Sequence, residues 1–282
     1  MGENRGRGDI ERCPQSSLGA TIKFIHHHQR KRAEASNGHA PATKKPSSLK
    51  KRKKNDMIHG DQHAAQKADT AMPPTCRIHP TAIIEDGVKI GAGSSVWDNV
   101  HLRYGAQIGE QCIVGEKSYL AYEVKTGNRV KINAFVYICT AVTIEDGVMI
   151  SAGTIFTNDR FPRAATPDLK QLRSSDPDEH TLPTLVREGA TIGAGCVIGN
   201  DLVIGRFAMV GMGSLVTKSV PDFHLVFGHP AKSVGCVCRC GQLLMRFSEN
   251  NGDGTTEIKC PACGLRYAVK DKVVLDLNPP NH

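Results

Sequence analysis

Residues 84–108 read IEDGVKIGAGSSVWDNVHLRYGAQI, with an aliphatic residue at every sixth position. The same period runs through two blocks of the chain, and 19 of its 20 positions, which we call the anchors, are Ile, Leu, Val or Phe. The anchors are Ile78, Ile84, Ile90, Val96, Leu102, Ile108, Val114, Leu120, Thr126, Ile132, Ile138, Ile144, Ile150 and Phe156, then Val186, Ile192, Ile198, Ile204, Val210 and Val216. A period of six fits neither an α-helix nor a long alternating strand. It predicts short strands joined by corners.

A second column of residues supports this interpretation. It lies four positions after each anchor and is small or β-branched: Ala82, Val88, Ser94, Val100, Ala106, Cys112, Ser118, Val124, Val130, Val136, Val142, Val148 and Thr154. Three short sides in each coil close a triangular prism, so the sequence predicts an all-β fold, a parallel β-helix of about seven coils and about 30 Å in height. A content of only 8 Phe, 5 Tyr and 1 Trp suits so narrow a core.

Glycine is frequent directly after the anchors. The examples are Gly91, Gly109, Gly115, Gly127, Gly193, Gly199, Gly205 and Gly211. Because glycine adopts a positive φ without steric cost, we expect these residues to turn the corners of the prism.

The repeat stops between Phe156 and Leu185. Residues 157–185 are charged and contain proline, so they cannot continue the stack of strands. Repeat proteins place such insertions on one face, often the binding face, and a loop of this length in a compact domain is usually functional. We therefore expect the active site beside this insertion.

The insertion and its flanks carry a specific pattern. It consists of Phe156-Thr157-Asn158, Pro162-Arg163, Thr184 to Ala194, Trp97 with Val100-His101, Val216 to Pro221, and Gly228 to Ala231. This pattern, over about residues 77–235, resembles the hexapeptide-repeat acyltransferases and, among them, the bacterial nucleotide-linked amino-sugar N-acetyltransferases of surface-polysaccharide synthesis. The chain departs from that family at Asn133-Ala134-Phe135, where the family tends to carry consecutive polar amides that face the nucleotide-sugar.

The resemblance implies several further expectations. The prism would be left-handed, although right-handed crossovers are the general rule for parallel strands. Acetyl-CoA would lie in a cleft between neighbouring prisms of a homotrimer, with Asn158 at the acetyl-transfer site. Lys218 would lie near the phosphates of CoA, and we expect the corner residues Gly193 and Gly211 to bind this donor with it.

Three side chains are candidates for the transfer site. Asn158 can donate and accept hydrogen bonds but takes no proton at neutral pH, so we expect it to position substrate; alternatively, it satisfies the loop backbone. His101 could act as a general base, or it is a surface or trimer-contact residue. Arg163 could hold a pyrophosphate or a sugar carboxylate by a bidentate fork, with Asn133 as a second substrate-binding residue, or it is a solvated loop charge.

Acetyl transfer from a thioester to an amine requires mainly that the site align the two substrates and stabilise an oxyanion. Alignment of an amine with a thioester can supply about 7–11 kcal/mol, and N–H groups at the corners could stabilise the oxyanion. A carbonic anhydrase on the same prism would need three His ligands for its zinc. The prism offers His101 and then no His until His180, so the ligand count excludes that reaction.

The cysteines near the C-terminus predict a metal site. Cys238, Cys240, Cys260 and Cys263 form CxC and CxxC pairs separated by 19 residues, and Cys236 is a rival for one ligand position. Four thiolates make a closed, structural zinc site, and binding of the metal would fold a small ribbon that has little core of its own. Cys112 and Cys196 are expected to be packing residues.

The N-terminal segment differs in composition from the rest. Residues 1–75 hold 15 Lys and Arg against 7 Asp and Glu, and the remaining residues hold 21 of each, so this segment carries the whole net charge of +8. We expect it to be disordered, as a solvated tail or as sequence upstream of a true start at Met57 or Met72. Nucleic-acid binding by the block from Lys44 to Lys54 is disfavoured, because no aromatic residue interleaves it.

The predicted organisation is thus a basic tail over residues 1–75, a β-helix acyltransferase domain over 76–235 and a zinc-ribbon-like module over 236–282. No apolar run is long enough to span a bilayer and no secretory signal is evident, so we expect a cytoplasmic protein. The expected activity is acetyl-CoA-dependent N-acetylation of a nucleotide-linked amino sugar. The alternatives are O-acetylation of another small acceptor and a non-catalytic trimeric scaffold.

Overall fold

The computed structural model describes residues 75–248 and 254–279, all of which belong to one compact unit. These residues contain 26 strands and no helix. The tail predicted over residues 1–75 lies outside the described residues except for Thr75.

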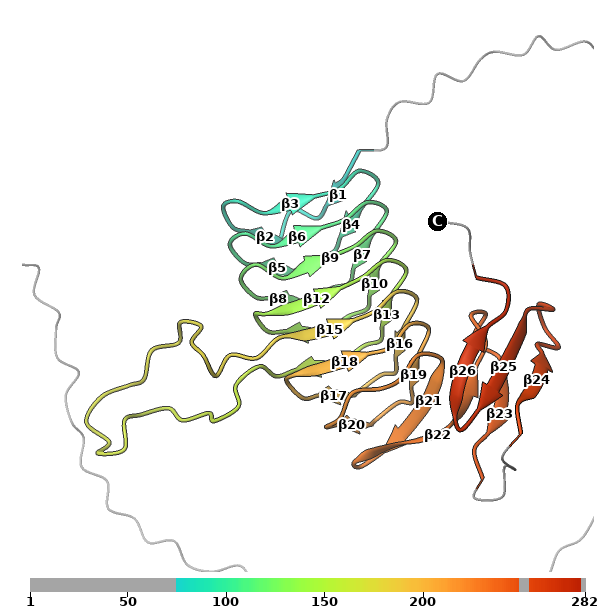
Figure 1. Ribbon diagram of the computed structural model, residues 1–282. Coiled ribbons are helices and arrows are strands. Elements are labelled where there is room, and N and C mark those ends of the chain that lie inside the picture. Colours follow the sequence, from blue (N-terminus) through green and yellow to red (C-terminus); the bar gives the residue numbers. More distant parts are fainter. Residues whose placement is uncertain (1–74, 249–253, 280–282) are drawn as a thin grey trace, which may run out of the picture. The chain divides into compact units, whose positions relative to one another are not determined.

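Three sheets form the sides of a parallel β-solenoid, which confirms the predicted fold class (Figure 1). The first sheet contains β1 (Arg77–Ile78), β4 (Ser95–Val96), β7 (Ile113–Val114), β10 (Lys131–Ile132), β13 (Met149–Ile150), β16 (Thr191–Ile192), β19 (Met209–Val210), β21 (His224–Gly228), β22 (Ala231–Val237) and β23 (Leu243–Arg246). The second contains β2 (Ile83–Ile84), β5 (His101–Leu102), β8 (Tyr119–Leu120), β11 (Tyr137–Ile138), β14 (Ile155–Phe156), β17 (Val197–Ile198) and β20 (Leu215–Val216). The third contains β3 (Lys89–Ile90), β6 (Gln107–Ile108), β9 (Lys125–Thr126), β12 (Val142–Ile144), β15 (Thr184–Val186) and β18 (Leu202–Ile204).

The register explains the sequence period. Each strand pairs in parallel with the strand three hexads later, as Ile78 does with Val96 and Val96 with Val114. Anchors therefore stack on anchors, and both columns predicted from the sequence line the interior: Leu102, Ile150 and the small residue Ala106 are all fully buried. The left-handed sense of winding stays a prediction that rests on the resemblance.

The corners differ from the sequence expectation. The residue with positive φ lies three positions after the anchor, as at Gly195 (φ 68°) and Asn99 (φ 53°), and not directly after it. The glycines that follow the anchors serve a close approach of coils instead. A Cβ on Gly109 would lie 2.1 Å from the carbonyl oxygen of Gly127, and one on Gly193 would lie 2.5 Å from the backbone nitrogen of Met212. The prediction of positive φ at these positions was wrong, because backbone crowding excludes the side chain there.

The insertion leaves the solenoid after β14 and returns at β15 (Figure 1). Its two ends meet in an antiparallel bridge between Asp159 and Thr181. It ends at Pro183, two residues earlier than expected, because Thr184 already pairs with Val142 and is buried in the small inward column.

The C-terminal strands continue the first sheet. β21 follows β19, and β22 and β23 add to it in antiparallel order. β22 runs across the boundary expected between residues 235 and 236, so the sheet of the prism extends without interruption into the C-terminal region. A separate antiparallel sheet follows, made of β24 (Thr256–Lys259), β25 (Arg266–Lys270) and β26 (Val273–Asp276).

Candidate active site at the base of the insertion

A cavity of about 550 Å³ lies where the insertion meets the second sheet. We call it the insertion cavity. Its floor comes from β8, β11 and the corners that follow them, and its walls come from the insertion. The lining residues are Arg103, Tyr119, Ala121, Tyr122, Tyr137, Cys139, Thr140, Asn158, Asp159, Phe161, Pro162, Arg163, Ala164, Leu172, Arg173, Ser174, Ser175, Asp176, Pro177, Asp178, His180 and Thr181.

Two residues predicted from the sequence meet in this cavity. Asn158 is half-buried, and its side-chain amide donates to the carbonyl oxygen of Thr140 at 3.4 Å. This contact also fits the alternative in which Asn158 satisfies the backbone beside the loop. Arg163 is exposed, and its guanidinium donates to the carbonyl oxygen of Pro162 at 2.9 Å.

His101 lies on β5 and does not line the insertion cavity. Its Nε2 is 2.8 Å from Oε1 of Glu85, and its ring meets the ring of Tyr119 edge-on at 5.4 Å. The strands β5, β8, β11 and β14 are successive neighbours in the second sheet. With about 4.8 Å between strands, His101 is about 14 Å from the end of β14, where Asn158 follows. His101 and Asn158 therefore do not share one substrate atom within a single chain.

An Arg–Tyr cluster that was not predicted from the sequence lies on this face. Arg103 pairs with Oε1 of Glu85 at 2.5 Å, donates to the hydroxyl of Tyr119 at 2.6 Å and also donates to the hydroxyl of Tyr122. Tyr119 in turn stacks on Tyr137, with ring centroids 5.2 Å apart. A signal for these residues exists in the sequence, because His101, Tyr119 and Tyr137 each precede an anchor at the same place in successive coils.

Glu85 is held as a carboxylate. The pKa of Glu85 is lowered by the N–H of Tyr104, which donates to it at 2.9 Å, and further by His101 and Arg103, against the opposing effect of burial. The ionised carboxylate therefore orients both His101 and Arg103.

Charges in the insertion cavity are mixed. Its lining carries three arginines and three aspartates: Arg103, Arg163, Arg173, Asp159, Asp176 and Asp178. Arg173 and Asp178 form an ion pair of 3.5 Å. The cavity can therefore meet an anionic group and a cationic group of the same ligand.

Cys139 lines the cavity but is a poor nucleophile. It is 4% exposed, and burial raises the pKa of its thiol to about 12. The thiolate is the reactive form of cysteine, so Cys139 stays protonated and inert at neutral pH.

A second cavity of about 630 Å³ lies beside the first. The two share Tyr122, Thr140, Thr181 and the segment 175–177, which form the wall between them. The other residues that line the second cavity are Tyr104, Glu123, Lys125, Ala141, Val142, Thr143 and Pro183. The base of the insertion thus has a hollow on each side.

The other predicted residues lie elsewhere on the prism. Asn133, Gly193 and Gly211 follow β10, β16 and β19 and share the corner between the first and second sheets. Lys218 is exposed and follows β20 at the corner that carries Asn158, two coils further on. The second sheet therefore separates Gly193 and Gly211 from Lys218 within one chain, although all three are expected to bind the donor.

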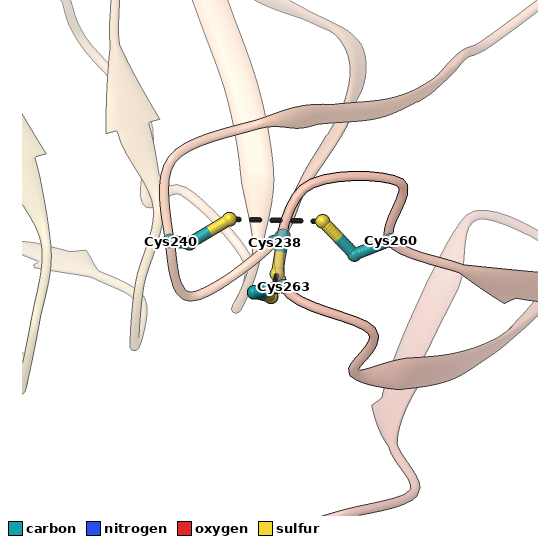
Figure 2. Close-up of side chains that lie close together, drawn as sticks. All are labelled: Cys238, Cys240, Cys260 and Cys263. Atoms are coloured by element: carbon teal, nitrogen blue, oxygen red, sulfur yellow. Dashed lines mark hydrogen bonds between the residues drawn. The ribbon is translucent and has the colours of Figure 1, made fainter.

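Four cysteines converge in the C-terminal region, as Figure 2 shows. The Sγ atoms of Cys238, Cys240, Cys260 and Cys263 all lie within 4.8 Å of one another, with 3.4 Å between Cys238 and Cys263 and 3.6 Å between Cys240 and Cys260. A tetrahedral zinc ion with four sulfurs at about 2.3 Å would hold them about 3.8 Å apart. Cys236 is not part of this group.

Tight backbone turns follow Cys240 and Cys263 and hold the four cysteines close together. Gly241 and Gly264 adopt φ of 88° and 79°, and the N–H of Gly264 donates to the carbonyl oxygen of Cys260. Burial alone would raise the pKa of Cys260, but the N–H groups of Cys263 and Ala262 and neighbouring thiols lower it to about 6. Burial raises the pKa of Cys238 inside the cluster to about 12 and that of Cys236 outside it to about 11.

Sequence comparisons identify relatives of the chain. A dTDP-3-amino-3,6-dideoxy-alpha-D-galactopyranose 3-N-acetyltransferase from Aneurinibacillus thermoaerophilus is 38% identical over 203 residues, which are 72% of this chain and 96% of that protein. A bifunctional protein GlmU from Heliobacterium modesticaldum is 27% identical over 179 residues, or 55% of this chain and 35% of that protein. No family model matches the chain.

Comparison with solved structures finds a mutant of AntD, an N-acyltransferase from Bacillus cereus, in complex with dTDP and coenzyme A. It has 21% sequence identity and a TM-score of 0.38, and the match covers 58% of this chain and 82% of that one. Within residues 75–248 and 254–279, no helix has the length and apolar character needed to cross a bilayer. The expected cytoplasmic location stays a prediction.

Proposed function

Because the chain belongs to the hexapeptide-repeat acetyltransferases, we propose that its insertion cavity is the place where acetyl passes from acetyl-CoA to the amine of a nucleotide-linked amino sugar. The observation that carries the proposal is the identity of 38% across 96% of a dTDP-amino-sugar N-acetyltransferase. That match is long enough to include the insertion as well as the coils. The enzyme is thus an acetyl-CoA-dependent N-acetyltransferase, and the acceptor is the proposed part.

The lining of the insertion cavity suits a nucleotide-sugar. Arg103 and Arg163 offer planar, permanently charged donors for the two phosphates. Tyr137 is 45% exposed and already stacks on Tyr119, so it gives a nucleobase a flat apolar surface. Asp159 and Asp176 can accept hydrogen bonds from the sugar amine and hydroxyls.

The transfer itself follows from simple acyl chemistry. The neutral amine attacks the thioester carbonyl and forms the new C–N bond, the carbonyl oxygen becomes an oxyanion, and collapse breaks the C–S bond and expels CoA as a thiolate, which takes up the proton that the amine loses. Asn158 is proposed to hold the reacting groups in line, since its amide donates and accepts but does not titrate. Loss of one such group costs about 10²-fold in kcat.

A homotrimer would complete the site. The outer residues of the second sheet form a column of Ile83, His101, Tyr119, Tyr137, Ile155, Val197 and Leu215, of which Tyr119 and Tyr137 line the insertion cavity, whereas those of the first sheet are Arg77, Ser95, Ile113, Lys131, Met149, Thr191 and Met209. An apolar face of this kind is typical of an interface. Packing it against a neighbour would bring the corner with Asn133, Gly193 and Gly211 of one subunit toward the Asn158 corner of the next, where Lys218 also lies.

The four cysteines are proposed to bind one structural zinc ion. Four sulfur ligands close the coordination shell, so the metal offers no open position for catalysis. Its expected contribution is to the folding of the C-terminal region.

Release of free CoA thiol from acetyl-CoA tests the proposed activity. The acceptors are dTDP-, UDP- and GDP-linked amino sugars and the corresponding free sugars. We expect turnover with one nucleotide-linked amino sugar, and a loss of about 10²-fold in kcat for Asn158→Ala. The absence of turnover with every acceptor, together with no acetyl-CoA binding by calorimetry, would leave only a scaffold.

Two control variants separate binding from loop anchoring. Asn200 donates to the carbonyl oxygen of Asp159 at 2.8 Å but does not line the cavity, so Asn200→Ala loosens the insertion without removing a lining group. Equal losses in Asn158→Ala and Asn200→Ala would reduce Asn158 to a loop anchor. For Arg163→Gln, the control is Lys170→Gln in the same insertion and outside the lining.

One observation favours O-acetylation as a second candidate. Glu85 accepts the Nε2 proton of His101 at 2.8 Å, which leaves Nδ1 as a base for an acceptor hydroxyl. Turnover of a sugar that lacks an amine, abolished by His101→Ala, would establish that activity.

A further inference from the structure

The cysteine cluster is tied directly to the last coil of the solenoid. The hydroxyl of Tyr267 is 3.2 Å from Sγ of Cys238 and accepts a hydrogen bond from the N–H of Arg239 at 3.0 Å. Tyr267 is fully buried. Its position fixes the loop that carries two of the four proposed ligands.

The ring of Tyr267 continues the contact into the prism. It meets Phe223 edge-on at 5.6 Å, and Phe223 stacks on Phe207 at 5.6 Å. Phe207 is the corner residue after β18, with φ of 53°, and its ring covers Gly189 one coil earlier, where a Cβ would lie 2.2 Å from the ring. Three aromatic rings therefore connect the metal cluster to two corners of the solenoid.

A hairpin made of β21 and β22 joins the same two parts. β21 covers the last coil, since Leu225 pairs with Met209 and Val226 is 3% exposed. β22 leads straight into Cys238. The buried His224 on β21 is 2.8 Å from the carbonyl oxygen of Lys272, and its other nitrogen is 2.9 Å from the hydroxyl of Ser233.

The two ends of the solenoid differ in exposure. At the N-terminal end, the anchor Ile78 is 44% exposed, whereas near the C-terminal end the anchors Val210 and Val216 are each 1% exposed. A solenoid needs a cap because its last repeat has no neighbour to cover its apolar face and its open strand edge. The β21–β22 hairpin supplies that cover.

We propose that the Cys238–Cys240–Cys260–Cys263 cluster is a zinc-dependent lock for this cap. The cluster holds the end of β22 and the Tyr267–Phe223–Phe207 stack together. Loss of the metal would free the hairpin and expose the last coil, while the first coils keep their packing. The proposal rests on the proposed zinc site and is independent of the acceptor and of the transferase reaction.

The test combines metal analysis with hydrogen exchange on the full-length protein. We expect one zinc ion per chain by elemental analysis. Removal of zinc by a chelator should raise amide exchange in β19, β21 and β22 by about ten-fold or more, with no change in β4 and β7. Addition of zinc should restore the protection.

Two variants test the metal ligands and the ring stack separately. Cys263→Ser, at an exposed ligand, should mimic the chelator without denaturing the first coils. Phe223→Leu keeps an apolar residue but breaks the ring stack, so it should retain zinc while protection of β21 falls. Protein that holds no zinc, or that holds zinc whose removal leaves β19, β21 and β22 unchanged, would overturn the proposal. CoA release is measured separately. A protein that lacks transferase activity but has a zinc-dependent cap would therefore contradict the proposed function and still support the proposed lock.

Discussion

Single residues at the corners do two different tasks in this fold. One position needs a left-handed backbone and is filled by Gly195 or by Asn99 in different coils. Certain corners also leave no room for a side chain directly after the anchor, as at Gly109 and Gly193, because the next coil lies against them, whereas Ala121 and Asn133 take that place at other corners. Only the crowded corners exclude every other residue type.

This distinction predicts the outcome of two alanine substitutions on neighbouring glycines. Gly193→Ala places a Cβ 2.5 Å from the backbone nitrogen of Met212, and backbone cannot move aside cheaply. We expect a loss of about 3 kcal/mol in the free energy of unfolding. Gly195→Ala has nothing within 4 Å and suffers only from its φ of 68°, so it should lose about 1–2 kcal/mol. Denaturant unfolding measures both, and a raised KM for acetyl-CoA with unchanged stability in Gly193→Ala would instead indicate a binding role.

The carboxylate of Glu85 predicts a pH dependence of stability. The N–H of Tyr104, and then His101 and Arg103, lower the pKa of Glu85 below its ordinary value of 4.5. A depressed pKa stabilises the fold above the ordinary value, and that stabilisation is lost as the pH falls through the lowered pKa. Glu85→Gln should therefore be less stable than wild type at neutral pH, and the difference should shrink below pH 4.5. Denaturant unfolding curves across this pH range measure the difference in the free energy of unfolding between wild type and Glu85→Gln, with Glu110→Gln as the control. A difference that stays constant with pH would contradict the assigned role of the Glu85 carboxylate.

At the scale of elements, the insertion is an appendage whose ends are already joined. Asp159 bridges Thr181, and the N–H of Leu182 donates to the carbonyl oxygen of Asn158 at 2.9 Å. The strands on either side, β14 and β15, pair with neighbours in their own sheets. The solenoid therefore does not depend on the insertion for its register.

Replacement of residues 160–180 by two glycines tests this independence. We expect a melting temperature within about 4 °C of wild type, because short closure of adjacent ends costs little. CoA release should fall by about 10²-fold or more, because the groups that align the acceptor are removed. The control replaces only residues 166–171, which do not line the insertion cavity. It also requires the loop to close, but it leaves the lining residues in place. Retained activity without residues 160–180 would move the active site away from the insertion.

At the scale of the whole molecule, the second sheet presents the apolar column described above. Ile155 on this sheet is 44% exposed and Ile113 on the first sheet is 40% exposed, so the two form a matched pair on different faces. Ile155→Asp should convert the proposed trimer to monomers, because it buries a charge at the interface. Ile113→Asp should leave the trimer intact. Sedimentation velocity distinguishes the species, and a wild-type monomer would count against the shared cleft.

Subunit mixing tests the shared site directly. His101 and Asn158 lie at least about 14 Å apart within one chain, three strand spacings along the second sheet, so a common site would draw them from two subunits. If both are needed, His101→Ala and Asn158→Ala should each be inactive alone. Mixed trimers formed at equal amounts should regain activity in about a quarter of their sites. No recovery after mixing would place both residues' roles within one subunit.

The sequence by itself determined the solenoid, its core and the four cysteines that converge in the C-terminal region. Each side of the prism is one hexad long, so residues that point inward recur every six positions, and Leu102 and Ile150 could be assigned to the interior from spacing alone. Local turns likewise bring CxC and CxxC pairs together, although only the structure excluded Cys236. The family pattern pointed to Asn158 and Arg163, which the structure brings to one cavity.

Only the tertiary structure decided what the outer surface does. A corner glycine can be required for its positive φ or for the close approach of the next coil. The distance to the next coil distinguishes these two reasons, and that distance cannot be read from the sequence. The Glu85–His101–Arg103 contacts join side chains from two coils, and Tyr267 reaches Cys238 and Phe223 from a separate sheet. Such contacts depend on side-chain direction and on packing between elements, and a six-residue repeat predicts neither.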